Sequence, residues 1–495
     1  MTPAMSTRGH ADPKARSFDL IAADRGNQAI PLLEGWLRQA PQDAVAWQLL
    51  ANARRNEQDG EGAHHAFERF AALRPADPKA CVGLAMAALE SGRPAARLFG
   101  QLIAQGHGTP DIVLSGVAAL TAEGEIGIAE QLLERALAER PDWLSGHDTL
   151  SSLRWRYGDA ERFDASFEAA VGRVALPFLW SAWINRLTQA ERFDAALGAL
   201  HKARALFGER PEFDAIEASI AIATGDPARA EVLFRSASGL DDMGTRIAYL
   251  RHCIRVKNLD RAQDLIHPFL TGPDAGAVWP YQSIVWRLQG DDRAKWLDGG
   301  SPFHRTMPLG LAANDLAMVA NLLGTREGQH RYPLDQSPRG GTQTEGNLLS
   351  HHAPCIRNLR KAIVQAVRDY AHDLPVVAGH PFLGTPRSDV RFSGSWSITL
   401  RGGGYHTCHT HPKGWMSGVL YLEVPSQDER GDSEKGSLEL GRPPEDLATG
   451  LPRYCRIEPR EGYIILFPST MWHSTIPFDK GTRLTVAFDV MPPRF

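Results

Sequence analysis

The sequence contains few cysteines, no strong excess of charge and no long apolar run. Only five of its 495 residues are cysteines, and none of them forms a CxxC pair. An odd number of scattered cysteines excludes a disulfide framework and is typical of reduced thiols, so we expect a cytoplasmic protein. No stretch reaches the roughly 18 uncharged apolar residues of a membrane helix. The first residues likewise lack the apolar segment of a secretory signal.

Charges of the two signs nearly balance, with 54 Lys and Arg against 58 Asp and Glu and a net charge of −4. This balance provides neither the basic surface that nucleic acid requires nor a polybasic patch for anionic lipid. We therefore expect no nucleic-acid partner and no membrane partner. Apolar residues make up 43% of the chain, which excludes a largely disordered protein. A length of 495 residues predicts two or three domains.

Residues 18–299 follow a helical period and contain a repeat. Residues that break helices recur every 32 to 34 positions, at Gly60, Gly92, Gly124, Gly158, Glu191, Gly225, Asn258 and Gly290. A small residue follows most of these turns at a nearly constant offset, and prolines close several units. In stacked helix hairpins, a residue with positive φ ends the first helix, the small residue lets the second helix pack closely, and proline stops it.

A period near 34 residues with this punctuation resembles the tetratricopeptide repeat. The resemblance is clearest in the unit that contains Trp47, Leu50, Ala51, Ala63, Phe67 and Pro75. It implies an all-α solenoid of about eight degenerate repeats over residues 18–299. We expect a disordered tail over residues 1–17 before it. Solenoids present concave surfaces, so a protein or peptide partner is expected.

Residues 300–390 form a transitional region, which we expect to be a helical linker and lid. Apolar spacing predicts helices over Asn314–Leu323 and Ile356–Leu374. The polar, glycine-bearing segment Tyr332–Gly346 between them is too long for a routine connection. It is therefore either a mobile linker or a lid over a functional site.

From Ser393 the pattern changes to short alternating strands, namely SWSITL, GVLYLEV, GSLEL, YIILFP and RLTVAFDV. Strands at this density predict a double-sheet jelly roll over residues 391–495, with the helix 356–374 on one face. The predicted fold class is α + β and multidomain: an N-terminal all-α solenoid followed by a C-terminal double-stranded β-helix with flanking helices.

Three histidines of the strand region are spaced for a metal site. His409 and His411 are separated by one residue, so on a strand both side chains point to the same face. The segment between His411 and His473 is long enough for several strands, so the chain can bring His473 back beside the pair. Three imidazoles from two segments can occupy one face of an octahedral metal and leave open positions. His406 is out of phase with His409 and is expected to face away, at the surface or behind the ligands.

Arg483 and Thr485 lie in RLTVAFDV, shortly after His473. A turn between them predicts that Arg483 and His473 occupy neighbouring strands. A fixed guanidinium binds a carboxylate through two parallel hydrogen bonds, and Thr485, two residues on, faces the same way. Taken alone, Arg483 is also explained by an ion pair with Asp489 or Glu439.

Together these residues resemble the 2-oxoglutarate/Fe(II)-dependent dioxygenases. That family carries His-x-Asp/Glu, a distal His, and an Arg or Lys about ten residues later with a nearby Ser or Thr. Residues 396–490 are most similar to a bacterial branch fused to tetratricopeptide repeats. The resemblance implies Fe(II), 2-oxoglutarate as cosubstrate and O2, with no catalytic residue beyond the metal centre. It assigns the site as follows: metal ligands His409 and His473, cosubstrate anchor Arg483, its hydroxyl partner Thr485, and Tyr421 beside the anchored carboxylate.

The sequence departs from the family pattern at His411, which stands where a carboxylate ligand is expected. Three interpretations are open: a site of three histidines, a site of two histidines with water in the third position, and a redox-silent site with zinc or no metal. Neutral imidazole is a suitable Fe(II) ligand, which favours the first.

Three functions are compatible with these features. The first is a hydroxylase acting on a protein or peptide that the repeats present. The second is a non-catalytic scaffold with a degenerate oxygenase domain, and the third is an oxygenase of a small metabolite. The missing carboxylate keeps the scaffold open, whereas Arg483 and Thr485 beside three histidines argue against it.

Overall fold

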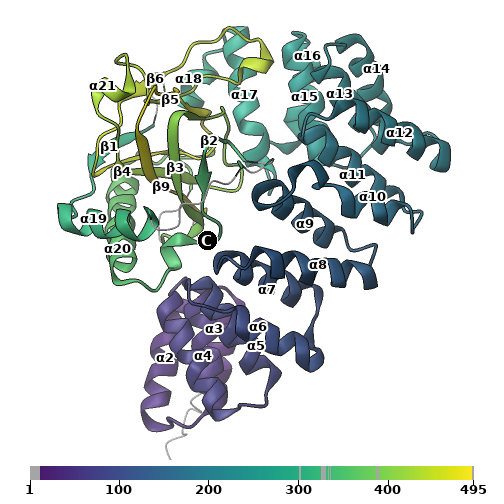
Figure 1. Ribbon diagram of the computed structural model, residues 1–495. Helices are drawn as coiled ribbons and strands as arrows, with labels where there is room; N and C mark the ends of the chain where they lie inside the picture. The colour runs from purple at the N-terminus through teal and green to yellow at the C-terminus, as the bar shows by residue number, and fades with distance from the viewer. Residues whose placement is uncertain are drawn as a thin grey trace, which may run out of the picture. The chain divides into compact units, whose positions relative to one another are not determined.

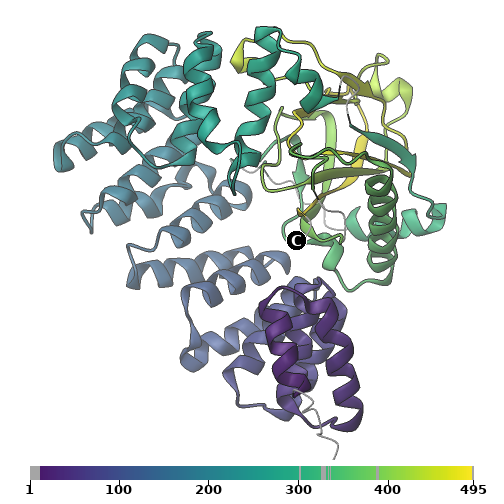
Figure 2. The same cartoon turned by 180° about the vertical axis from the view of Figure 1, so that it is seen from behind.

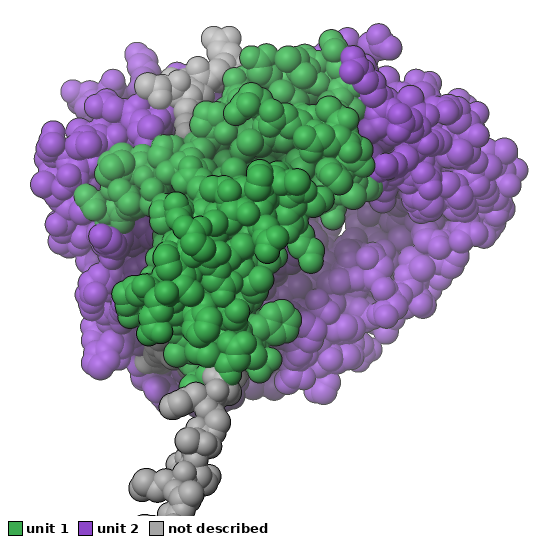
Figure 3. All heavy atoms as spheres, turned by 90° about the horizontal axis from the view of Figure 1, so that it is seen from below, with its two compact units in different colours: residues 1–132, 346–358 green, residues 133–345, 359–495 purple. Residues whose placement is uncertain are grey.

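The computed structural model describes residues 12–299, 303–324, 331, 332, 334, 336–385 and 389–492. The chain divides into two compact units (Figure 3). The first unit contains residues 1–132 and 346–358, and the second contains residues 133–345 and 359–495. Among the described helices, none combines the length and the apolarity needed to cross a bilayer. The boundaries predicted from the sequence at residues 299 and 390 stay a prediction.

Successive helix pairs make up the described chain before Gly299 (Figures 1 and 2). The first unit holds the helices up to the first half of α8, and the second unit holds the others. Their bounds are α1 Pro13–Ala22, α2 Gly26–Gln39, α3 Ala44–Asn56, α4 Gly60–Leu73, α5 Pro78–Glu90, α6 Ala96–Leu102, α7 Pro110–Ala122, α8 Ile126–Glu139, α9 Leu144–Tyr157, α10 Ala165–Val171, α11 Pro177–Gln189, α12 Phe193–Phe207, α13 Pro211–Ala223, α14 Pro227–Ala237, α15 Met243–Arg255, α16 Leu259–Ile266, α17 Ala275–Gln289 and α18 Arg293–Asp298.

These pairs confirm the tetratricopeptide-like solenoid, with one pair more than expected. Helix α1 begins at Pro13, so residues 13–17 are helical and the predicted disorder is wrong for them. Residues 1–11 of the predicted tail lie outside the described residues. The small residues after the turns are buried as predicted, which lets the paired helices pack closely; they include Ala63, Ala129, Ala196, Ala230 and Ala262.

Five predicted helix breakers have positive φ, namely Gly92, Gly124, Glu191, Gly225 and Gly290. Of the other three, Gly158 caps the end of α9 as predicted but without a positive φ, whereas Gly60 and Asn258 are wrong in position. The left-handed residues are Gln58 and Lys257, just before Gly60 and Asn258, and Gly158 has φ −119. Gly60 begins α4, and Asn258 caps α16 by accepting a hydrogen bond from the amide of Arg261. Both residues belong to the start of the following helix rather than to the end of the preceding one.

Part of the predicted linker belongs to the first unit. The backbone amide of His352 donates to the carbonyl of Ser91 at 2.9 Å. The imidazole Nδ1 of His352 lies 2.9 Å from the same oxygen. A Cβ on Gly92 would lie 2.2 Å from the ring of His351, so only glycine fits there. Residues 346–358 are therefore packed against the turn after α5.

The strands form two sheets in the second unit (Figure 1). The six-stranded sheet has the order β1-β7-β4-β9-β3-β2, and the three-stranded sheet has the order β6-β5-β8. This double sheet confirms the jelly roll. The strand bounds are β1 Arg305–Pro308, β2 Pro338–Gln343, β3 Phe392–His406, β4 Met416–Glu423, β5 Leu438–Leu440, β6 Cys455–Ile457, β7 Tyr463–Pro468, β8 His473–Thr475 and β9 Thr482–Val490.

The segment Tyr332–Gly346 is not a free linker. Its residues Pro338–Gln343 form β2, which pairs antiparallel with β3 at the edge of the six-stranded sheet. Its residues 333 and 335 lie outside the described residues. The lid interpretation stays a prediction.

Two predicted helices flank the sheet, α19 (Ala313–Gly324) and α20 (Pro354–Asp373). The guanidinium of Arg360 in α20 lies 5.9 Å from the ring centre of Phe392 in β3. Asp373, at the end of the same helix, pairs with Arg305 of β1 at 2.7 Å. One short helix and five helical turns complete the described elements: α21 Gln427–Arg430, η1 Ile103–His107, η2 Ala160–Arg162, η3 His267–Phe269, η4 Leu348–Ser350 and η5 Glu445–Leu447.

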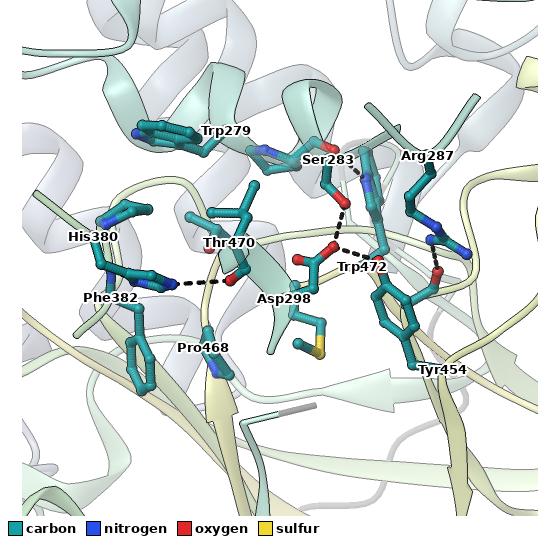
Figure 4. Close-up of a pocket in the computed structure, with 15 residues that line it drawn as sticks. Trp279, Ser283, Arg287, Asp298, His380, Phe382, Tyr454, Pro468, Thr470 and Trp472 are labelled. Carbon is teal, nitrogen blue, oxygen red and sulfur yellow. Dashed lines mark hydrogen bonds between the residues drawn. The ribbon is translucent and has the colours of Figure 1, made fainter. Parts of the chain in front are cut away.

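The last helix pair of the solenoid is joined to the jelly roll within the second unit (Figure 4). Arg287 of α17 donates to the carbonyls of Gly441 at 2.6 Å and Pro452 at 2.5 Å. Asp298, at the end of α18, accepts from Ser283 at 2.5 Å and from the hydroxyl of Tyr454. These contacts surround a cavity of about 20 Å³, which has room for one water molecule.

Candidate functional site

Three histidines from two separate segments meet inside the jelly roll. The backbones of His409 and His473 are joined by reciprocal hydrogen bonds of 3.0 and 3.1 Å. The ring centres of His409 and His473 lie 4.2 Å apart, and that of His411 lies 5.0 Å from each of them. One ligand nitrogen from each ring lies within 4.8 Å of the other two. The predicted convergence is present, although an isolated backbone bridge rather than a continuous strand produces it.

Hydrogen bonds at Nδ1 orient all three rings. His409 Nδ1 lies 2.7 Å from the carbonyl of Thr407, and His473 Nδ1 lies 3.0 Å from that of Met471. His411 Nδ1 bonds to the carboxylate of Asp489. Because these partners are acceptors, each Nδ1 is the nitrogen that donates to them, and Nε2 is the nitrogen available to a metal.

Burial keeps two of the rings in the neutral form that a metal requires. Burial, with a smaller contribution from the neighbouring His411, lowers the pKa of His409 to about 4. Burial also holds the pKa of His473 well below 6.5, with His409 and His411 adding to the effect. At neutral pH these imidazoles are uncharged donors, which suits a divalent metal.

The rings open into a cavity of about 530 Å³, a volume within the range of small-molecule sites. Its walls come from both sheets and from the segment before β2. The lining consists of Leu334, Gln336, Ser337, Gln343, Trp396, Ile398, His406, Thr407, His409, Thr410, His411, Ser417, Gly418, Val419, Tyr421, Leu438, Phe467, His473, Ser474, Thr475, Arg483, Thr485, Ala487 and Phe488.

Arg483 lies in the same cavity and is 3% exposed. It donates to the carbonyl of Gly436 and to the hydroxyl of Thr475, each at 3.2 Å. Its Nε has no hydrogen-bond partner among the described residues. Burial lowers the pKa of this guanidinium, with no carboxylate offsetting it. A buried cation with an unused donor fits the far carboxylate of a dicarboxylate.

The alternative that Arg483 pairs with an acidic residue is wrong. Asp489 bonds to His411 and to Ser417, and Glu439 bonds to Arg453 at 2.7 Å. The expectation of neighbouring strands for Arg483 and His473 is wrong as well. β8, which carries His473, pairs with β5 in the three-stranded sheet, whereas β9 pairs with β3 and β4 in the other sheet. The two residues therefore face each other from opposite sheets.

Thr485 and Tyr421 lie beside Arg483 on the cavity wall. The hydroxyl of Thr485 donates to the carbonyl of Ile398 at 3.4 Å. The ring centre of Tyr421 lies 5.8 Å from the guanidinium carbon of Arg483. Burial raises the pKa of Tyr421, so its phenol stays protonated and can donate a hydrogen bond.

The structure also places His406 and Ser337 at the site. The ring of His406 lies 6.0 Å from that of His409 and lines the cavity, so the expectation that it faces away is wrong. The strand alternation assumed between His406 and His409 does not hold, because β3 ends at His406 and Thr407 and Cys408 lie outside any strand. The hydroxyl of Ser337 lies 3.0 Å from His406 Nδ1 and 3.2 Å from His409 Nε2. Sequence spacing contains no sign of Ser337, because it reaches the site from the segment before β2.

Residues 394–489 match the family model described as "Putative 2OG-Fe(II) oxygenase". They form a 2-oxoglutarate- and Fe(II)-dependent oxygenase domain, a class of enzyme that uses Fe(II), 2-oxoglutarate and O2. The donors described above fit both groups: three oriented imidazoles for the metal, and a buried guanidinium for the cosubstrate. No curated protein matches the chain.

Several solved structures are similar to parts of the chain. A prolyl-4-hydroxylase from Pseudomonas putida is 18% identical, with 42% of this chain and all of that one covered and a TM-score of 0.28. HygX from Streptomyces hygroscopicus, solved with nickel and 2-oxoglutarate, is 14% identical over 39% of this chain and 85% of its own, with a TM-score of 0.28. A tetratricopeptide repeat protein from Parabacteroides merdae is 14% identical over 48% of this chain and 95% of its own, with a TM-score of 0.31.

Proposed function

We propose that this protein is a hydroxylase that binds Fe(II) through His409, His411 and His473 and holds 2-oxoglutarate with Arg483. One observation carries the proposal. Three imidazoles, each oriented by an acceptor at its Nδ1, share a cavity with a buried guanidinium that has no acidic partner among the described residues. A scaffold gains nothing from a buried, uncompensated cation, which costs folding free energy.

The residues of the cavity have three roles: some bind the metal, some bind the cosubstrate, and the others exclude water. Arg483 would take the far carboxylate of 2-oxoglutarate, with Thr485 and Tyr421 as neighbouring hydroxyl donors. Apolar side chains such as Trp396, Val419 and Phe467 line the cavity and exclude water from it. When bound, the metal and its cosubstrate would supply the oxidising chemistry that, with O2, converts a substrate C–H into C–OH and 2-oxoglutarate into succinate and CO2.

Of the three interpretations of His411, we propose the site of three histidines. Support comes from its Nδ1, which is engaged by Asp489, and from a ligand nitrogen within 4.8 Å of those of His409 and His473. A ring in that position with its proton held on the far side has its lone pair directed to the same point as the others.

For the substrate we propose a protein or peptide presented by the solenoid. The support is the firm attachment of α17 and α18 to the jelly roll through Arg287 and Asp298, together with the use of helical-repeat surfaces for binding extended partners. The cavity volume also suits a small metabolite, which is the competing substrate class.

The test is an anaerobic titration of the purified protein with Fe(II) and 2-oxoglutarate, followed by the visible charge-transfer band of the chelate. We expect the band in the wild type and its loss in His409→Ala. In Arg483→Ala we expect weaker 2-oxoglutarate binding, so that a higher concentration is needed to produce the band. Loss of the band in His411→Ala would indicate a site of three histidines, whereas a retained band would indicate a site of two. Folded, metal-loaded protein without the band and without 2-oxoglutarate binding overturns the proposal in favour of the scaffold.

A further inference from the structure

The Nδ1 atom of His411 has a different type of hydrogen-bond acceptor from the Nδ1 atoms of His409 and His473. His409 and His473 each bond to the carbonyl oxygen two residues before them, Thr407 and Met471. His411 instead bonds to a side-chain carboxylate, that of Asp489, which comes from a distant part of the sequence. A carboxylate raises the basicity of an imidazole ligand more than a neutral carbonyl does.

We infer that Asp489 is a positioning residue that supplies, through His411, the anionic character that a ligand set of three neutral imidazoles lacks. This inference rests on the proposed function, because it requires His411 to bind the metal. Asp489 is not among the cavity-lining residues, so it acts behind the ring rather than as a ligand.

A buried hydroxyl pair holds the carboxylate in place. The second oxygen of Asp489 accepts from Ser417 at 2.6 Å, and Ser417 lies 2.9 Å from the hydroxyl of Ser469. All three residues are buried, with Ser417 2% and Ser469 0% exposed. Ser469 also accepts, through its carbonyl, the backbone amide of His411 at 2.8 Å. Asp489, Ser417 and Ser469 are therefore linked to one another, and together they hold His411 at its ring and at its backbone amide.

The backbone leaves this carboxylate little freedom to move. Ser417 in β4 and Asp489 in β9 are direct partners in the sheet register. A Cβ on Gly414 would lie 2.4 Å from the hydroxyl of Ser469 and 3.4 Å from Cβ of Asp489, so the loop after His411 packs directly on the pair. A rigid acceptor orients a metal ligand better than a mobile one does.

The test measures metal affinity rather than turnover. Co(II) is titrated anaerobically into the full-length protein and followed by its visible absorption. We expect Asp489→Asn, which keeps the shape and removes the charge, to weaken Co(II) binding roughly 10- to 100-fold. The matched control is Asp298→Asn, the same substitution at a half-buried aspartate of the same unit outside the metal site, and it should bind Co(II) like the wild type.

A double-mutant cycle separates positioning from a general structural effect. In the His411→Ala background, Asp489→Asn should produce no further loss, because its action passes through that ring. An equal loss in both backgrounds, or wild-type affinity in Asp489→Asn, overturns the inference. If Asp489→Asn does not fold, Ser417→Ala takes its place, and unchanged Co(II) affinity in that variant counts against the inference.

The same titration distinguishes failure of the inference from failure of the proposed function. Wild-type protein that binds no Co(II), or binds it equally in His409→Ala, removes the proposed metal site itself. Co(II) binding that depends on His409 and His411 but not on Asp489 removes only the inference.

Discussion

Arg483 and Asp489 lie on the same side of one strand, β9, and bond to groups at the two ends of the functional site. Arg483 is beside Thr475 and Tyr421, whereas Asp489 contacts His411. Side chains of a strand alternate between its faces, so residues at even spacing share one side. A single strand therefore carries the proposed cosubstrate anchor and the support of a proposed metal ligand, and its register fixes the distance between them.

Ala487 lies on this side of β9 between the two and lines the cavity. We expect Ala487→Leu to fill the space between anchor and metal, and to lower 2-oxoglutarate affinity at least roughly tenfold by overpacking. Co(II) affinity should stay within about twofold of the wild type, because the substitution touches no histidine acceptor. Calorimetric titration of each ligand measures both values. A loss of both would indicate a general distortion of the sheet.

Replacing Arg483 with methionine should separate stability from function. The free protein holds this cation buried without a carboxylate partner among the described residues. We therefore expect Arg483→Met to be at least as stable as the wild type towards urea without ligand, since removing an uncompensated buried charge recovers its desolvation cost.

The stabilisation that 2-oxoglutarate confers should disappear in the same variant. For the wild type with bound metal it should reach about 2.7 kcal/mol when the ligand concentration is 100 times Kd. Urea unfolding with and without 2-oxoglutarate measures the difference. Equal stabilisation of wild type and Arg483→Met would contradict the role of Arg483 as anchor.

The hydroxyl of Ser337 lies 3.2 Å from His409 Nε2, the nitrogen proposed to bind the metal. Metal binding at that nitrogen must break this contact, whose net contribution is about 1 kcal/mol. We expect Ser337→Ala to bind Co(II) up to about fivefold more tightly, the opposite direction to Asp489→Asn. Weaker binding in Ser337→Ala would mean that the serine assists the metal instead of competing with it.

At the junction of solenoid and jelly roll, Tyr454→Phe should lower stability. Asp298 loses the phenol donor and keeps only Ser283. Burial raises the pKa of this carboxyl, so a missing donor is costly. We expect a loss of about 1.5–3 kcal/mol in the free energy of unfolding by urea. When Asp298→Asn is combined with Tyr454→Phe, the loss of stability should be smaller than the sum of the two single losses, because both substitutions remove the same interaction. Additive losses would exclude this coupling.

Stability should fall in mildly acidic solution because of His380. Its Nδ1 accepts from the amides of Phe382 and Leu383, and its Nε2 donates to the carbonyls of Trp296 and Leu297. Burial lowers its pKa below 6.5, so on acidification the unfolded state takes up the proton first. Its contribution is complete above pH 6.5 and is lost below it, with a slope of at most about 1.4 kcal/mol per pH unit.

Urea unfolding of the wild type and of His380→Asn between pH 7.5 and 5 tests this contribution. The asparagine oxygen can accept from the same amides without titrating, so the difference in stability between the two proteins should shrink as the pH falls. A difference that does not change with pH would show that the pKa of His380 is the same in the folded and unfolded states, and would contradict the prediction.

The repeat could be predicted from the sequence because its turn residues and small residues recur at constant spacing. The exact helix ends could not: Gln58 and Lys257 take the left-handed conformation although glycine and asparagine stand close by. Where a neighbouring residue can cap the next helix, this capping decides which position takes the left-handed conformation. The spacing of the helix breakers alone does not show it.

At the site, sequence spacing predicted that His409, His411 and His473 meet, but it put Arg483 on a strand beside that of His473, whereas the two strands lie in different sheets. It missed Asp489 as the partner of His411, since the sheet register that aligns it with Ser417 is a long-range property. It also misplaced His406, because β3 ends at this residue and the alternation of side chains does not continue to His409.

The reciprocal backbone bonds of His409 and His473 also make the site visible to hydrogen exchange. Each amide is the other segment's donor, so both are exposed to solvent only when the loop after β3 separates from β8. A metal held by these two side chains would have to be released, or its ligands separated, before that opening. The exchange rates of these two backbone amides would then report metal occupancy without the need for a substrate, a metal absorption band or turnover.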